Sequence, residues 1–268
     1  MDKTKKHICL VDGSTYIFRA YHALPPLTRK SDGFPVGAIA GFCNMLDKLV
    51  KEEKEKKAIT NLLVVFDASG KTFRNNIYPN YKANRSEAPE DLIPQFPVIR
   101  KATEAFNIPY VELMGYEADD LIASYSRAAQ KENMKVTIVS SDKDLMQLVS
   151  DNVSMLDTMK NKIVQKEEVY EKFGVYPEKV IDVQSLAGDS VDNIPGVPGI
   201  GIKTAALLIN EYGNLDGLFK NSEKIKQKKR RENIIEFEEQ AYLSKKLVTL
   251  RDDVPLPIPI QETTLKDI

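Results

Sequence analysis

Apolar and polar residues are distributed along the first 150 residues in a way that predicts buried strands separated by amphipathic helices. Continuous apolar runs predict strands at residues 7–12 (HICLVD), 61–67 (NLLVVFD), 108–113 (IPYVEL) and 135–142 (KVTIVSSD). Apolar residues at helical spacing predict helices over residues 36–57 and 117–133. Because apolar strands that alternate with helices are typical of a mostly parallel sheet covered on both faces, the predicted fold class is α/β.

The pattern changes beyond residue 160, where helices joined by turns rich in glycine and proline replace the strands. Helices are predicted at KEEVYEKFG (166–174) and PEKVIDVQSLAG (177–188), and a further one over 232–248. A basic stretch, KNSEKIKQKKRR (220–231), precedes that last helix, and a Pro-rich tail follows it. We therefore expect a sheet domain at 1–160 and a helical module at 161–268.

Acidic residues gather at the predicted ends of strands and starts of helices. Two strands end in acids, a third strand leads into SSDKD, and a helix begins with EADD. The segment GDSVD carries two acids three residues apart, which would share a face if the segment were helical. The nine acids are Asp12, Asp67, Glu117, Asp119, Asp120, Asp142, Asp144, Asp189 and Asp192. Any single pair could simply cap a helix. Those at residues 12 to 144 are jointly expected to meet, because parallel strands bring their carboxyl ends to one edge of the sheet.

Such a cluster of carboxylates persists only if cations occupy it or if several of the acids are protonated. Two like charges 4 Å apart repel by about 4 kcal/mol at an effective dielectric constant near 20. Hard divalent ions with oxygen ligands, Mg²⁺ or Mn²⁺, fit this chemistry. Two such ions would supply a hydroxide and stabilise the leaving oxygen of an in-line phosphoryl displacement. The sequence therefore predicts a two-metal phosphodiesterase site.

Composition agrees with an all-carboxylate site. The chain of 268 residues has two His and two Cys, which excludes the usual zinc site and a disulfide framework, and favours a reducing cytoplasm. No apolar run is long enough for a membrane helix, and we expect no secretory signal. The net charge of −1 argues against a DNA partner. However, if nine of the 39 acids are metal ligands, 30 acids remain against 38 basic residues. The rest of the protein is then basic, as expected of a DNA-binding protein.

Two further segments could bind phosphates. Residues 71–85 (KTFRNNIYPNYKANR) contain four basic residues, three aromatics and no acid, and Lys82 and Arg85 could share one helical face toward a scissile phosphate. Alone, this could be an ordinary basic loop. The second segment, IPGVPGIGIKTAALL (194–208), places a Gly-x-Gly turn before a helix whose free N–H groups could bind phosphate. It is a poor Walker loop, because Ile202 separates Gly201 from Lys203.

Five motifs occur together and in one order: VDGSTYIFRAYHAL, VVFDASGKTFRNNIYPNYKANR, GYEADDLIASYS, VSSDKDLMQLV and GDSVDNIPGVPGIGIKTA. With them, residues 5–255 resemble the 5′-nuclease (5′-3′ exonuclease) domain of bacterial DNA polymerase I, in the flap endonuclease family. The resemblance implies a PIN-like core with an arch at 71–100 and a helix-hairpin-helix at 188–213. It also implies Mg²⁺-dependent cleavage of DNA at 5′ flaps and 5′ ends beside a duplex junction, including RNA/DNA primer ends, in replication and repair.

Residue roles follow from the same resemblance. One metal site would use Asp12, Asp67, Glu117 and Asp119 with Asp120 close by, and a second Asp142, Asp144, Asp189 and Asp192. Lys82 and Arg85 match arch residues that steer the scissile phosphate. Further expected DNA contacts are Phe18, Arg19, Arg74, Tyr81, Gly199, Gly201, Lys203 and Thr204. The Gly199–Gly201 turn resembles a duplex-binding hairpin whose carbonyls often hold K⁺.

The remaining expectations concern partners, chain length and alternative functions. The tail QETTLKDI (261–268) lacks the aromatic pair of a sliding-clamp peptide, so no clamp contact is expected, and the protein is expected to be a monomer. A polymerase I chain would continue beyond Ile268, so this sequence is either a stand-alone nuclease or an excised domain. The competing functions are a non-catalytic junction-binding module and a PIN-type ribonuclease.

Overall fold

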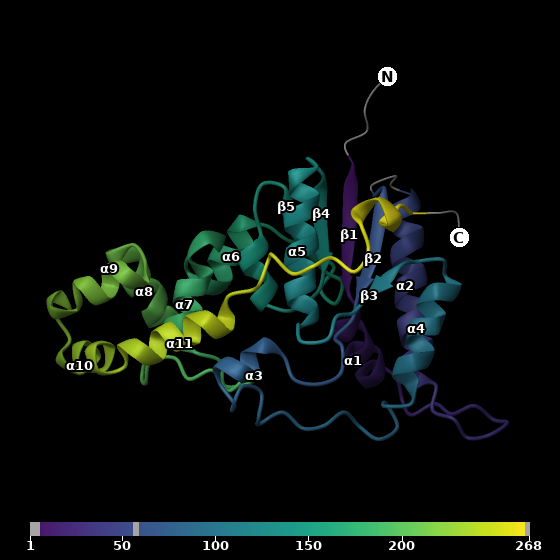
Figure 1. The fold of residues 1–268 in the computed structure, drawn as a ribbon, viewed down its shortest axis with the longest axis horizontal. Coiled ribbons are helices and arrows are strands. Elements are labelled where there is room, and N and C mark those ends of the chain that lie inside the picture. The colour runs from purple at the N-terminus through teal and green to yellow at the C-terminus, as the bar shows by residue number, and fades with distance from the viewer. Residues whose placement is uncertain (1–5, 56–58, 266–268) are drawn as a thin grey trace.

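The structure is a computed structural model that describes residues 6–55 and 59–265. Its centre is a six-stranded sheet with the order β3-β2-β1-β4-β5-β6 (Figure 1). The strands are β1 (His7–Asp12), β2 (Asn61–Val65), β3 (Tyr110–Val111), β4 (Lys135–Val139), β5 (Val153–Asp157) and β6 (Lys162–Val164). All neighbours pair in parallel except β5 and β6, which are antiparallel. The predicted α/β class with a mostly parallel sheet is confirmed.

The central strands are buried on both faces, which explains their unbroken apolar sequences. Successive side chains of a strand point to opposite faces. Accordingly, Ile8 and Leu10 pack with helix α5 (Ala118–Lys131), whereas Cys9 and Val11 pack against the other helical layer. That layer consists of α1 (Gly13–Ala23), α2 (Gly37–Glu55) and α4 (Gln95–Ala105). Residues 56 and 57 of the predicted helix 36–57 lie outside the described residues.

Strands β5 and β6 were not predicted. The β5 sequence VSMLD mixes polar and apolar residues, and β6 has only three residues, so neither gives an unbroken apolar run. The short β5–β6 connection has Asn161 in the left-handed region at φ 48°. Because β6 ends at Val164, the sheet continues four residues past the expected boundary at residue 160.

The remaining helices form a region that extends away from the sheet on the side of β5 and β6 (Figure 1). They are α6 (Lys166–Phe173), α7 (Val180–Ala187), α8 (Ile202–Tyr212), α9 (Leu215–Lys220), α10 (Lys228–Glu236) and α11 (Glu238–Val248). The predicted helix 232–248 is therefore two helices, which meet at Phe237. Short helices lie at α3 (Phe73–Ile77) and, in 3₁₀ form, at 144–148, 177–179, 222–224 and 260–263.

The turn after α7 brings two glycine backbones together. A Cβ on Gly188 would lie 2.5 Å from the carbonyl oxygen of Ile194, and one on Gly196 would lie 2.4 Å from the amide nitrogen of Gly188. Both glycines also have positive φ, at 67° and 59°. Only glycine fits such a close approach, and it shapes the loop that carries Asp189 and Asp192.

The chain leaves α11 and returns across the sheet domain, as the yellow segment of Figure 1 shows. The Tyr125 hydroxyl donates to the carbonyl oxygen of Ile258 at 2.7 Å, and Asn61 forms an isolated bridge with Thr264. The C-terminal residues thus help to build the core. Residues 266–268 of the tail considered for a clamp peptide lie outside the described residues. No helix among those described has the length and apolarity needed to cross a membrane.

Candidate active site

The carboxyl ends of β1, β2 and β4 meet at one edge of the sheet, as predicted, and each leads into an acid. Asp12 is the last residue of β1 and the N-cap of α1, where its Oδ1 accepts from the amide of Thr15 at 2.9 Å. Asp67 follows β2, and its Oδ1 accepts from the amide of Ala118 at 2.8 Å. This second contact ties the end of β2 to the start of α5.

The acids at the start of α5 are set by the helix cap. Glu117 is the N-cap, and the Asp120 carboxylate accepts from the Glu117 amide at 3.1 Å in a capping box. Asp119 lies in the first turn between them. The helix N-terminus thus orients three acids, and the partial positive charge there favours them.

A cavity of about 260 Å³ opens over this edge, and seven of the nine predicted acids line it. They are Asp12, Asp67, Glu117, Asp119, Asp142, Asp144 and Asp192. Lys82, Arg85 and Tyr81 line the same cavity from the segment that follows α3. The structure therefore brings seven of the nine expected carboxylates and the two expected cations, Lys82 and Arg85, to one place.

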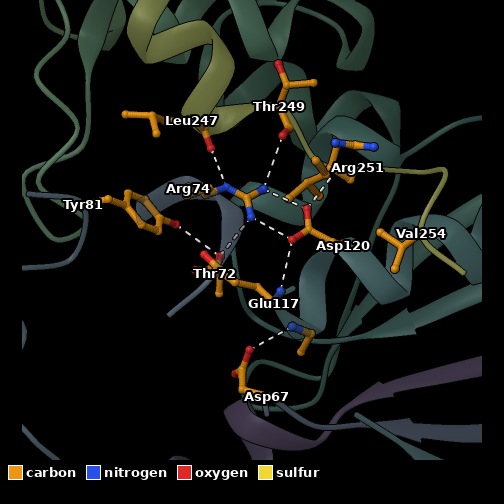
Figure 2. Close-up of polar contacts among 12 residues, drawn as sticks. Asp67, Thr72, Arg74, Tyr81, Glu117, Asp120, Leu247, Thr249, Arg251 and Val254 are labelled. Carbon is orange, nitrogen blue, oxygen red and sulfur yellow. Dashed lines mark hydrogen bonds and ion pairs between the residues drawn. The ribbon is translucent and has the colours of Figure 1, made fainter. Parts of the chain in front are cut away.

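Asp120 is a different case, because its carboxylate is fully buried and already paired (Figure 2). Arg74 donates to it twice, Nη1 to Oδ2 at 2.7 Å and Nη2 to Oδ1 at 2.8 Å. The amide of Arg251 also donates to Oδ1, at 2.9 Å. Together with the Glu117 amide, these donors occupy both oxygens, so the expectation that Asp120 lies among the metal ligands is corrected.

Arg74 is buried by the same network, with 1% of its surface exposed. Its Nε donates to the carbonyl oxygen of Leu247 at 2.8 Å, and its Nη2 to that of Thr249 at 3.3 Å. Although Arg74 lines the cavity, its guanidinium is committed to these protein groups (Figure 2). The expectation of a DNA contact at Arg74 is corrected: the residue joins the arch segment, α5 and the end of α11.

Asp189 also lies outside the group that lines the cavity. Its Oδ2 pairs with Lys143 Nζ at 2.5 Å, and its Oδ1 accepts from the amide of Val191 at 2.8 Å. The segment is a tight turn closed by a bridge between Asp189 and Ile194, not a helix. Asp189 and Asp192 therefore do not share a helical face, and only Asp192 reaches the cavity.

Burial, and after it the charges of neighbouring acids, raise the pKa of several carboxyl groups in the cavity. Burial raises the pKa of Asp12 to about 6, although hydrogen bonds from Thr15 and Ser140 oppose this rise. Burial, and then the charge of Asp142, raise the pKa of Asp144 to about 7. Asp119 has a pKa well above its usual range because of burial and of four neighbouring acids. The negative charge of the neighbouring acids in this cavity favours the binding of cations.

Two cations of the arch segment reach the acids directly. Lys82 Nζ lies 2.8 Å from Glu117 Oε1 and 3.7 Å from Asp192 Oδ2, and Arg85 pairs with Asp192 Oδ1. The backbone of Lys82 is in the left-handed region at φ 57°, which a non-glycine residue rarely adopts. Tyr81 is 4% exposed, and its hydroxyl donates to Glu117 Oε2 at 3.1 Å, which anchors the segment.

Of the other expected DNA contacts, Phe18 lines the acid cavity and the rest lie outside it. Phe18 is 42% exposed at the cavity edge, whereas Arg19 donates to the side chain and carbonyl oxygen of Thr158. Gly201 is the N-cap of α8, and Gly199 before it has φ 76°. Lys203 and Thr204 occupy the first turn of α8, where Lys203 is exposed. The predicted Gly-x-Gly turn thus does open a helix.

Several supporting residues were not predicted. Ser140 Oγ donates to Asp12 Oδ2 at 2.7 Å, Gln184 Nε2 to Asp144 Oδ1 at 2.6 Å, and the Asp67 amide to Ser14 Oγ at 3.1 Å. Ser14 and Ser140 stand beside predicted acids at strand ends, a position that could have drawn attention to them. Gln184 lies inside α7, 40 residues from its partner, and nothing in the local sequence indicates this contact.

The carboxylates of the cavity are suitable ligands for divalent metal ions. Whether they can bind such an ion depends on how many ligands the ion needs from the protein. Within the described residues, no three His, Cys, Asp or Glu side chains are placed so that they would hold one ion as they stand. Mg²⁺, however, usually keeps several waters and takes one or two carboxylates. Asp119 is available for this, because the described residues give its carboxylate neither a hydrogen bond nor an ion pair. The residues therefore fit hydrated divalent ions shared among the cavity acids.

Comparison with known proteins identifies the family. Residues 7–174 match the model described as "5'-3' exonuclease, N-terminal resolvase-like domain", and residues 175–268 match "5'-3' exonuclease, C-terminal SAM fold". The chain belongs to the 5′-3′ exonuclease family. The family suggested by the five motifs is confirmed, as is the PIN-like core followed by a helical module.

Relatives in the 5′-3′ exonuclease family cover nearly the whole chain. A DNA polymerase I of Rhizobium leguminosarum is 57% identical over 267 residues, which are 98% of this chain but 26% of that protein. A 5′-3′ exonuclease of Aquifex aeolicus is 42% identical over 261 residues, 97% of this chain and 87% of the relative. The chain therefore spans about a quarter of the polymerase and most of the exonuclease.

Solved structures agree with this fold. A bacteriophage T5 flap endonuclease, described as a pseudo-enzyme-product complex with DNA and metal ions, matches with a TM-score of 0.75 and 25% identity. The match covers 92% of this chain and 90% of that chain.

Proposed function

We propose that this member of the family is a structure-specific 5′-3′ exonuclease and 5′-flap endonuclease that hydrolyses DNA phosphodiester bonds with two divalent ions, Mg²⁺ or in its place Mn²⁺. The observation that carries the proposal is the single cavity in which seven acids face Lys82 and Arg85. Relatives named as 5′-3′ exonucleases and a neighbour with DNA and metal ions support it. Its substrates would be 5′ flaps and 5′ ends at duplex junctions, RNA/DNA primer ends included, in cytoplasmic DNA replication and repair.

Bound divalent ions would activate a water and stabilise the leaving oxygen. Asp12, Asp67, Glu117 and Asp119 would hold one ion, and Asp142, Asp144 and Asp192 the other. Asp189 would support this second group through the turn that it shares with Asp192. The hydrogen bonds from Thr15, Ser140 and Gln184 fix Asp12 and Asp144, so these ligands need little reorganisation when ions bind.

Lys82 and Arg85 would hold the scissile phosphate over the acids. Their present partners are Glu117 and Asp192, so a phosphate that enters replaces one anion by another near the same cations. Charge-assisted hydrogen bonds to the phosphate oxygens would then stabilise the charge that develops during in-line attack. Duplex DNA would dock at residues 199–204, which we call the α7–α8 turn and which comprise the Gly-x-Gly turn and the start of α8. There Gly199, Gly201, Lys203 and Thr204 offer amides and a cation, and K⁺ would bind.

Cleavage of a labelled 5′-flap duplex, with mapping of the products, tests the proposal. We expect cleavage beside the junction in Mg²⁺ and none in EDTA. Binding without cleavage in both Mg²⁺ and Mn²⁺ would establish the non-catalytic junction-binding module instead. Faster cleavage of single-stranded RNA than of flap DNA would establish a PIN-type ribonuclease.

Lys82→Ala is expected to slow single-turnover cleavage about 10²–10³-fold, the range found when one donor to a developing charge is removed. Its effect on duplex affinity should be far smaller, because the α7–α8 turn is unchanged. Lys131→Ala, at the exposed end of α5, is the matched control. A large loss of affinity with an unchanged cleavage step would assign Lys82 to binding alone.

Flap affinity is expected to fall steeply with salt. Each phosphate neutralised by a basic residue contributes a slope of about −0.9 to a plot of log binding constant against log salt concentration. Anisotropy titrations between 50 and 200 mM KCl, about the range over which such losses are large, would measure it. Lys203→Ala should make the slope shallower by about 0.9, the contribution of one neutralised phosphate. A flat response in the unmodified protein would contradict docking through phosphates.

A further inference from the structure

A second cavity, of about 490 Å³, opens beside the carboxylate cavity. Its walls come from α1, from the end of β2 and from α4, and include Ile17, Phe18, Phe66, Phe96, Pro97 and Arg100. Ser14, Phe18 and Asp67 line both cavities. The two cavities therefore share a wall at the carboxyl end of β2, and a nucleotide strand that lies in one can reach the other.

The walls of this second cavity suit a flat aromatic group. Phe18, which is 42% exposed, meets Phe96 edge to face with 6.5 Å between ring centroids. The Arg100 guanidinium lies over the Phe66 ring, 4.8 Å from its centroid. Aromatic walls with a few polar groups are typical of small-ligand sites, and every nucleobase can stack on such rings.

The charges around this cavity favour a base over a phosphate. Arg100 is the basic residue in the wall, and its guanidinium is committed to protein acceptors. Its Nε donates to Glu112 at 2.7 Å, and Nη2 donates to the carbonyl oxygen of Asp67 at 3.1 Å. A phosphate would meet Asp67 and Glu112 without a free cation in the wall, whereas a neutral base would not be repelled.

The position of this cavity relative to the duplex selects which base it would hold. Helix α4 and helix α8, which begins directly after Gly201, lie on opposite sides of the carboxyl ends of β1 and β2 (Figure 1). With duplex at the α7–α8 turn and the scissile phosphate at the acids, the strand that continues past α4 is the flap. We propose that this base cavity binds the nucleobase of the flap nucleotide immediately 5′ of the scissile phosphate. This inference rests on the proposed function.

The fluorescence of 2-aminopurine, placed at that flap position, tests whether the base enters the base cavity. The measurement is made in Ca²⁺ or EDTA so that the flap is not cleaved. Stacking in the base cavity should change the emission on binding. Phe96→Leu, which keeps apolar packing but removes the ring, should abolish most of that change. Phe219→Leu, at a partly buried ring of α9, is the matched control. The proposal would be overturned if Phe96→Leu and Phe219→Leu gave the same emission change on binding. It would also be overturned if a probe three nucleotides farther toward the 5′ end of the flap gave the same signal.

Cleavage gives a second and independent test. An abasic site at that nucleotide should lower kcat/KM about 5- to 100-fold for the unmodified protein, in the range expected for loss of one stacked base. Phe96→Leu should cause a similar loss on the intact flap and little further loss on the abasic flap. Additive losses would show that the ring and the base do not interact. If no flap is cleaved at all, the proposed function fails, while the fluorescence change still decides the base cavity.

Discussion

Asp119→Asn is expected to lower single-turnover cleavage of a 5′ flap in Mg²⁺ by at least about 100-fold. Loss of a group that only supports a metal ligand costs about 10- to 100-fold, and a ligand itself should cost no less. Flap affinity in Ca²⁺ or EDTA should change little, because Asp119 lines the acid cavity, whereas the proposed duplex-docking residues 199–204 do not. Rapid-quench cleavage and anisotropy binding would measure the two effects separately.

The same variant should be more stable than the unmodified protein when divalent ions are absent. Burial raises the pKa of Asp119, and the charges of the neighbouring Asp142, Asp12, Asp67 and Glu117 raise it further. Replacing this acid with a neutral amide removes that repulsion, so Tm in EDTA should rise. The gain should shrink in Mg²⁺, which stabilises the unmodified protein by binding. Asp47→Asn, on the exposed surface of α2, should change neither cleavage nor this difference in Tm. Unchanged turnover in Asp119→Asn would contradict its role as a ligand.

Arg74→Met is expected to lower the free energy of unfolding by about 3–5 kcal/mol, the cost of removing one partner from a buried ion pair. The variant leaves Asp120 with no cation in a fully buried position, and it leaves the carbonyl oxygen of Leu247 without the donor Nε. Denaturant unfolding followed by circular dichroism would measure the change. Arg127→Met is the control, because Arg127 pairs with Asp252 on the surface and should cost only about 0–1 kcal/mol.

A double variant shows whether the loss comes from the unpaired acid. Arg74→Met combined with Asp120→Asn should recover part of the stability, because the neutral amide costs less to bury than an unpaired carboxylate. Asp120→Asn alone should leave the Mg²⁺ concentration for half-maximal cleavage nearly unchanged, in contrast to Asp119→Asn. A large shift in that concentration would return Asp120 to the metal ligands. Additive losses in the double variant would show that the two residues are not coupled.

Much of the site could be predicted because its signals are local. Mainly apolar runs give the positions of β1, β2 and β4, and an acid at the end of a run or within three residues of it stays near the strand end in any parallel sheet. The capping position likewise places Glu117 and Asp119 at the start of α5. These inferences need only the geometry of one strand or one helix and the rule that parallel strands share an edge.

Other features could not be predicted from single segments. Strands β5 and β6 are short and partly polar, so their pairing depends on β4 being beside them rather than on their own pattern. The turn at Asp189 depends on close contact between Gly188 and Gly196, which a helical spacing argument does not detect. As a result, only one of the two acids in this turn faces the cavity.

The sequence by itself determined the α/β class, the family and the identity of the acids at the sheet edge, since these follow from periodicity and from motifs in fixed order. Only the tertiary structure decided which acids remain available to ions. Arg74 lies 46 residues from Asp120 and 173 from Leu247, and one of its acceptors is a backbone carbonyl that any residue could supply. Such a contact leaves no pattern in the sequence, because it exists only once the end of α11 packs beside the arch segment. That packing buries Asp120 in an ion pair and leaves Asp119, its neighbour in the chain, facing the cavity.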